Sequence, residues 1–177
     1  TGRLPSVENS LMKLALQKMT VGIVLRVVHA ALVELYALDS RVKDEFDRMP
    51  EGLSYALQTG YRAPQLFVQW KGGKLHRLTE LAKPVCALRL KSTGISFRMF
   101  TGQMGLAQAY AQHAFSMQGE IADVMKLARL VNLVEGYLFP KFITKHILTD
   151  IPTLQVNPLR VYGRVLCGFL TGRYNYS

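Results

Sequence analysis

The sequence has few of the residues that build common catalytic and metal centres. Of its 177 residues only two are cysteine and four are histidine, and 12 acidic residues stand against 22 basic ones. The motifs of serine hydrolases, zinc proteases, thiol redox proteins, phosphate-binding loops and dinucleotide-binding folds are absent. The four histidines lie far apart in the sequence. We therefore expect no catalytic residue set and no metal site.

The two cysteines do not indicate a disulfide framework. Cys86 and Cys167 each lie within an apolar run. Free cysteine in such a run is usually a small buried hydrophobic residue, so we expect both to be buried and reduced. This favours a soluble, intracellular protein, and we predict a cytoplasmic location.

One apolar run is long enough to be tested as a membrane span. Residues 20–38 are strongly apolar, but Arg26 and Glu34 interrupt them near the middle. A central arginine costs at least ~2.5 kcal/mol on membrane insertion scales. We therefore expect a long helix that is largely buried in protein, with an in-plane membrane helix as the alternative.

Hydrophobic periodicity divides the chain into helical and strand-like parts. Gly22, inside the first helical pattern, marks an expected bend or a division into two helices. The expected elements, in chain order, are helices over 6–38 and 41–47, strands over 53–57, 66–71, 75–78 and 85–91, helices over 95–99 and 106–113, a strand over 114–118, and helices over 121–138, 142–148 and 159–170. This order predicts one α+β domain over 1–177, with a mostly antiparallel sheet covered by helices on one face.

The net charge of +10 favours anionic partners. Between Gly60 and Lys91, basic residues alternate with Tyr61, Phe67 and Trp70, a composition that some RNA-binding sheets share. The sequence motifs of those modules are missing, so nucleic acid is not favoured as a partner. In the C-terminal segment 141–177, Arg160 and Arg164 lie four residues apart beside apolar residues. This indicates peripheral contact with an anionic membrane, and the alternative is that the apolar stripe packs on the core.

Residues 97–121 carry a family resemblance. Gly102 follows a short apolar helix, Ala109 and Tyr110 lie in the next helix, and an apolar strand ends in Gly119–Glu120. This stretch resembles the sterol carrier protein type-two (sterol-binding) domain family, in which the strand usually ends in Gly-Asp. The element order agrees with that family over roughly 40–140. The helical segment 6–38 and the C-terminal extension 141–177 are not accounted for.

The resemblance implies a five-stranded sheet covered by helices, with an apolar tunnel between them that binds sterols, acyl chains or similar lipids. It implies no shared catalytic residues, and some members assist quinone or lipid metabolism. Each buried CH2 group of a lipid contributes about 0.8 kcal/mol, so such a tunnel binds without polar chemistry. The candidate lining residues are Phe97, Phe100, Met104, Tyr110, Phe115, Met125, Leu127, Leu130, Val134 and Leu138.

The sequence therefore predicts non-catalytic binding, with transfer as an extension, of a lipid or other hydrophobic ligand. We expect no cofactor other than a bound lipid or acyl chain, and the oligomeric state stays open. The main alternatives are a protein-interaction module with a filled core and an accessory factor in lipid or quinone metabolism. An enzyme would need His113 or Tyr110 to face a cavity beside a second titratable group.

Overall fold

The computed structural model describes residues 5–81, 83–139 and 152–174, and its longest element is helix α1 (Pro5–Leu38). Helix α1 has 34 residues and is continuous, so the expected bend at Gly22 is absent. A Cβ atom at Gly22 would lie 3.4 Å from the side chain of Pro64. The loop before β2 therefore packs on the helix at this point, at a distance that a small side chain would also tolerate.

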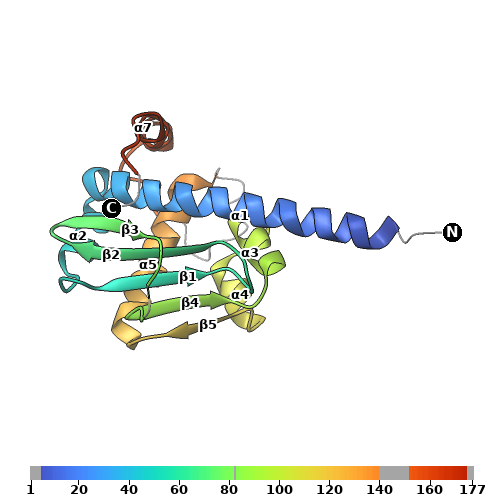
Figure 1. The fold of residues 1–177 in the computed structure, drawn as a ribbon. Coiled ribbons are helices and arrows are strands. Elements are labelled where there is room, and N and C mark those ends of the chain that lie inside the picture. Colours follow the sequence, from blue (N-terminus) through green and yellow to red (C-terminus); the bar gives the residue numbers. More distant parts are fainter. Residues whose placement is uncertain (1–4, 82, 140–151, 175–177) are drawn as a thin grey trace.

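Five strands form a single mixed sheet (Figure 1). They are β1 (Ser54–Gln58), β2 (Gln65–Lys71), β3 (Lys74–Leu78), β4 (Cys86–Leu90) and β5 (Phe115–Gln118), in the order β3-β2-β1-β4-β5. Neighbouring strands are antiparallel except β1 and β4, which are parallel. The expected mostly antiparallel, five-stranded sheet is confirmed.

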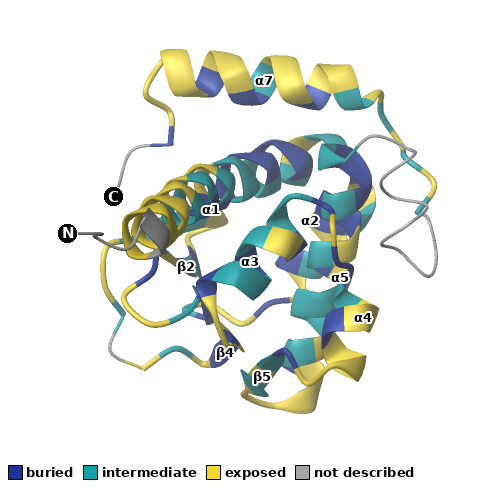
Figure 2. Ribbon diagram, turned by 90° about the vertical axis from the view of Figure 1, so that its right-hand side faces the viewer, coloured by how far each residue is buried: buried dark blue, intermediate teal, exposed yellow. Residues whose placement is uncertain are grey.

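The remaining described helices are α2 (Ser40–Asp47), α3 (Thr93–Phe100), α4 (Leu106–Ala111), α5 (Ile121–Leu138) and α7 (Pro158–Leu170). Figure 2 shows α1, α3 and α5 gathered on one side of the sheet, with α7 lying outside α1. The α+β fold with helices on one face is therefore confirmed. The helix expected over 142–148 lies outside the described residues.

The core forms where the alternating strand residues meet the helices. On β2, Leu66, Val68 and Trp70 are buried while their neighbours are less covered. The ring of Trp70 stacks on Phe46 of α2, with 5.0 Å between the ring centroids. Trp70 is therefore not available to stack on a nucleic-acid base, which removes one support for RNA binding.

The two cysteines differ in burial. Cys86, at the start of β4, is buried as expected, and burial raises the pKa of its thiol to about 11. Cys167 is exposed, so its predicted burial was wrong. Apolar residues lie on both faces of helix α7, so the sequence alone did not show which face is buried. The buried face carries Val161, Val165 and Gly168, and Cys167 lies on the other face. Both cysteines are free.

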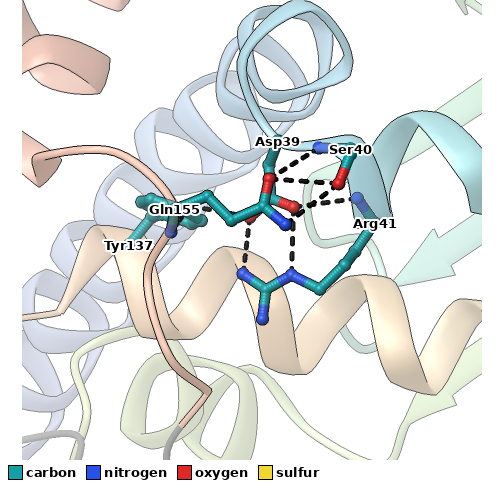
Figure 3. A network of polar contacts seen from close by, with 5 residues as sticks. All are labelled: Asp39, Ser40, Arg41, Tyr137 and Gln155. Atoms are coloured by element: carbon teal, nitrogen blue, oxygen red, sulfur yellow. Dashed lines mark hydrogen bonds and ion pairs between the residues drawn. The ribbon is translucent and has the colours of Figure 1, made fainter.

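A buried carboxylate joins three elements near the end of α1 (Figure 3). Asp39 caps α2 by accepting a hydrogen bond from the main chain of Arg41, and it also accepts bonds from the Arg41 guanidinium and the Tyr137 hydroxyl of α5. Burial alone would raise the pKa of Asp39, but these hydrogen bonds hold it below its usual value. Gln155 completes the network through Ser40 and the Tyr137 oxygen. The corner between α1, α5 and residues 152–157 is thus fixed by polar contacts.

A second buried carboxylate fastens α7 to α1. Glu34 accepts hydrogen bonds from Arg164 at 2.5 Å, Arg173 at 2.8 Å and the Tyr174 hydroxyl at 2.7 Å. Glu34 is therefore satisfied inside protein, as expected for a buried helix. Arg164 is therefore paired with Glu34 although 41% of its side chain is exposed, and the predicted contact of Arg160 and Arg164 with a membrane stays a prediction.

By length and composition, residues Val7–Leu38 of α1 could cross a membrane. A core helix of a soluble protein satisfies the same criteria. In this structure the part of α1 after residue 20 packs on the sheet and on α7, with Val21, Leu25, Ala30 and Leu35 fully covered. The part before residue 20 is largely exposed.

Candidate ligand cavity

An apolar cavity of about 90 Å³ lies between the sheet and the helices that cover it. Its wall is almost entirely apolar, and Glu135 is the one charged side chain among the described residues that line it. The lining residues are Val24, Val28, Leu32, Phe46, Tyr55, Ala56, Leu57, Leu66, Val68, Leu75, Leu88, Phe100, Leu127, Leu130, Val131, Val134, Glu135, Leu138 and Phe139. An apolar void of this kind stays dry and accepts apolar guests.

Local periodicity directs these side chains into one space. On α1, Val24, Val28 and Leu32 recur every four residues and so share one face of the helix. On β2, every second residue faces the helices, which brings in Leu66 and Val68, and β1 contributes the consecutive residues Tyr55, Ala56 and Leu57. Helix α5 closes the cavity, and α1 and α5 are in direct contact.

Glu135 is the only acidic residue in the wall of this cavity within the described part of the chain. One of its carboxylate oxygens, Oε2, is buried without a hydrogen-bond partner. Burial raises the pKa of Glu135 to about 7. The side chain is therefore a polar group, partly protonated at neutral pH, that can donate or accept one hydrogen bond at the edge of an apolar space.

Half of the lining residues predicted from the resemblance lie in the wall of the cavity. They are Phe100, Leu127, Leu130, Val134 and Leu138. Four of the five belong to α5, whose apolar stripe was the clearest helical pattern in the sequence.

The other five predicted residues do not line the cavity. Tyr110 lies on the outer face of the short helix α4 and is 73% exposed. Met125 lies on the outer face of α5 and is 51% exposed. Met104 is buried in a separate cluster beneath α4, and Phe115 packs at the edge of that cluster. Phe97 packs against the main core without reaching the cavity wall. The prediction that these five residues line the cavity was therefore wrong.

Sequence reasoning missed the contribution of α1 and the sheet. The resemblance covered roughly 40–140, so Val24, Val28 and Leu32 were outside it, although their spacing of four residues is visible in the sequence. Glu135 was also missed, although it interrupts an otherwise apolar stripe between Val134 and Leu138. A charged residue inside such a stripe is the signal that could have identified it.

Tyr110 and His113 are both exposed and neither lines the cavity. Within residues 5–81, 83–139 and 152–174, no three histidine, cysteine, aspartate or glutamate side chains gather to hold a metal ion.

Comparisons with known proteins give similarities in structure alone. No protein-family model and no curated protein matches the sequence. Among solved structures, a ubiquinone synthesis protein described as UbiJ-SCP2 aligns with a TM-score of 0.43 and 16% identity, over 61% of this chain and 96% of that one. Sterol carrier protein 2 like 2 from Aedes aegypti aligns with a TM-score of 0.35 and 16% identity, over 54% of this chain and 94% of that one. Both solved proteins are sterol carrier protein type-two domains by name, and both similarities are weak.

Proposed function

We propose that this chain binds a hydrophobic small molecule, such as a lipid, in the cavity between the sheet and helices α1 and α5, without catalysing a reaction. The observation that carries the proposal is an apolar wall contributed by both layers of the fold, with an acidic group at one point. Apolar pockets with few polar groups are typical of sites for small hydrophobic ligands.

The energetics favour occupation of the cavity. An empty void of about 90 Å³ costs the fold about 2 kcal/mol relative to a filled one. That volume is smaller than a 150 Å³ engineered cavity that accepts benzene. A sterol or long acyl chain is larger than this space, so its binding requires the cavity to enlarge, through new rotamers of the surrounding side chains and movement of α1 away from α5.

Glu135 would determine how an amphipathic ligand is oriented in the cavity. A ligand with a hydroxyl, carbonyl or similar head group would meet the unpartnered Oε2 atom, while its hydrocarbon part lies along α5 and the sheet. Satisfying a buried polar atom recovers about 1–3 kcal/mol, so an amphipathic ligand is preferred over a pure hydrocarbon.

The test is ligand recovery and uptake by the purified chain. Native mass spectrometry and solvent extraction would identify any lipid carried from the cell, and titration with fluorescent acyl and sterol probes would measure saturable binding. The variant Val131→Phe places a larger side chain in the cavity wall, and Val85→Phe makes the same change at an exposed position. We expect Val131→Phe to weaken probe binding at least tenfold and Val85→Phe to leave it unchanged.

Absence of any recovered lipid together with absence of saturable uptake would contradict the proposal. Equal binding by wild type and Val131→Phe would show that the ligand binds elsewhere on the molecule. Thermal unfolding of each variant, followed by circular dichroism, controls for misfolding. A protein-interaction module with a filled core is the alternative that such negative results would favour.

A further inference from the structure

The first half of helix α1 carries a stripe of apolar residues that the described part of the chain leaves largely uncovered. The residues recur at intervals of four, three and four positions, and each is more than half exposed: Met12, Leu16, Met19 and Ile23. This alternation of three and four is the spacing at which one helix lines a seam against another helix. These four residues form an exposed surface of that kind, the α1 seam.

Further along α1, the same face already packs against a helix. Ala30 and Glu34 follow Ile23 by seven and eleven positions, which places them on the face of the α1 seam at 3.6 residues per turn. Both are buried, and Glu34 is bonded to Arg164 of α7. Helix α7 lies over the second half of α1 and contacts it (Figure 1). The α1 seam therefore continues a helix-packing face, of which α7 covers only the second half.

A charged residue of opposite sign stands beyond each end of the α1 seam. Glu8 precedes the seam by four positions, Arg26 follows it by three, and both are exposed. Among the described residues, neither side chain has an ion-pair partner. The two residues are 18 positions apart, which is five helical turns, so they lie on the same edge of the seam and about 27 Å apart along it. They cannot pair within one chain.

A second copy of α1, laid antiparallel on the seam, supplies both missing partners. The midpoint between Glu8 and Arg26 coincides within one position with the midpoint of the seam. A two-fold axis at that point therefore brings Glu8 next to Arg26 of the partner subunit, and the symmetry repeats the contact at the other end. A parallel pair would place two Glu8 side chains together. An anionic membrane would cover the apolar residues but would repel Glu8.

We propose that the α1 seam binds the α1 seam of a second copy of this chain, as an antiparallel pair of helices with a Glu8–Arg26 contact between the copies at each end. Both copies use the same residues, as two-fold symmetry requires. The seam is smaller than the roughly 20–30 residues a side of a stable interface, so the pairing is reversible, with a dissociation constant in the micromolar range. None of the four seam residues lines the apolar cavity, so this pairing is independent of the proposed lipid binding.

Sedimentation equilibrium of the full chain, from about 5 to 500 µM, measures the pairing directly. Leu16→Glu places a carboxylate of each copy in the centre of the seam. Leu14→Glu is the matched control, because it makes the same change at an exposed position on the opposite side of the helix. We expect Leu16→Glu to raise the dissociation constant at least tenfold and Leu14→Glu to leave it unchanged.

Charge reversal tests the antiparallel arrangement. Glu8→Lys and Arg26→Glu, made singly, each set like charges against one another at both ends of the seam, and each should raise the dissociation constant about tenfold. The chain that carries both substitutions has the same ion pairs with their charges exchanged. We expect its dissociation constant to return to within about threefold of the wild-type value. Such a recovery requires the two positions to meet between copies.

Three results would overturn the proposal. They are a wild-type chain that stays monomeric over the whole concentration range, equal weakening by Leu14→Glu and Leu16→Glu, and no recovery in the doubly reversed chain. A monomeric chain that floats with vesicles of phosphatidylcholine and phosphatidylglycerol, and loses this property in Leu16→Glu, would show that the seam binds membrane instead. Circular dichroism of each variant during thermal unfolding controls for misfolding.

Discussion

The buried carboxyl of Glu135 should make the free energy of unfolding depend on pH. Burial raises its pKa from 4.5 to about 7, so the folded chain holds this proton more firmly than the unfolded chain does. Stability contributed by the protonated form is therefore present below pH 4.5 and is lost as the pH rises toward 7. We expect Glu135→Gln to raise the free energy of unfolding by on the order of 2 kcal/mol at pH 8 and to change it little at pH 4.

Urea unfolding of the two proteins between pH 4 and pH 8 measures this difference. Glu120→Gln, at an exposed position before α5, is the matched control and should give a difference that does not vary in this way. A constant difference for Glu135→Gln across the pH range would mean that its carboxyl is not held in an apolar environment.

The residues of the first cavity show what a sequence can predict about a site. Leu127, Leu130, Val134 and Leu138 were predictable because one helix repeats them at three- and four-residue intervals. Tyr110 could not be placed, because α4 has only six residues and its pattern does not define a buried face. Phe46 and Leu88 come from elements that only the tertiary fold brings to α5.

At the scale of elements, local patterns predicted the helices and strands better than their pairing. The bounds of α5 agree with the expected range 121–138, because an apolar stripe runs between Gly119 and Pro140. The parallel pairing of β1 with β4 was not predicted, because it depends on where the chain returns after the β2–β3 hairpin. No local residue pattern encodes that return.

The attachment of α7 to α1 depends on a glycine within α7. A Cβ atom at Gly168 would lie 2.2 Å from the hydroxyl of Tyr174, which donates a hydrogen bond to Glu34. Gly168→Ala should therefore displace the tyrosine ring and leave Glu34 with one donor fewer. We expect a loss of about 1–2 kcal/mol in the free energy of unfolding and faster proteolysis of residues 152–174.

Gly163 provides the comparison on the same helix. Nothing lies within 4 Å of a Cβ atom at that position. Gly163→Ala should stabilise the chain by about 0.5–1 kcal/mol, because alanine loses less backbone entropy in a helix. Equal effects of the two substitutions would show that the packing of Tyr174 on Gly168 contributes nothing.

At the scale of the whole molecule, the charge of +10 and the outer face of α7 favour contact with an anionic membrane. Leu159, Leu166 and Leu170 are exposed along that face, beside Arg160. We expect the chain to float with anionic liposomes at low salt, and to do so less as salt screens charges over ~8–10 Å. Arg160→Glu should reduce flotation.

The control for this prediction is Arg48→Glu, which reverses an exposed charge at the end of α2. Arg164→Glu is unsuitable, because it would place a second carboxylate against Glu34 and loosen α7. Equal flotation on neutral and anionic liposomes would exclude docking by charge.

The unbroken course of α1 has a consequence for how the particle moves in solution. A helix of 34 residues is about 51 Å long, and its first half extends beyond the sheet in Figure 1. A compact chain of 177 residues has a radius of gyration of about 16 Å. Small-angle scattering should therefore give a larger radius, and rotational diffusion should be anisotropic, with slow tumbling of the helix axis. The strands run roughly along the direction of α1 in Figure 1, but their N–H bonds lie across it, whereas the N–H bonds of α1 lie along its axis. Amide relaxation rates in α1 would then differ from those in the strands.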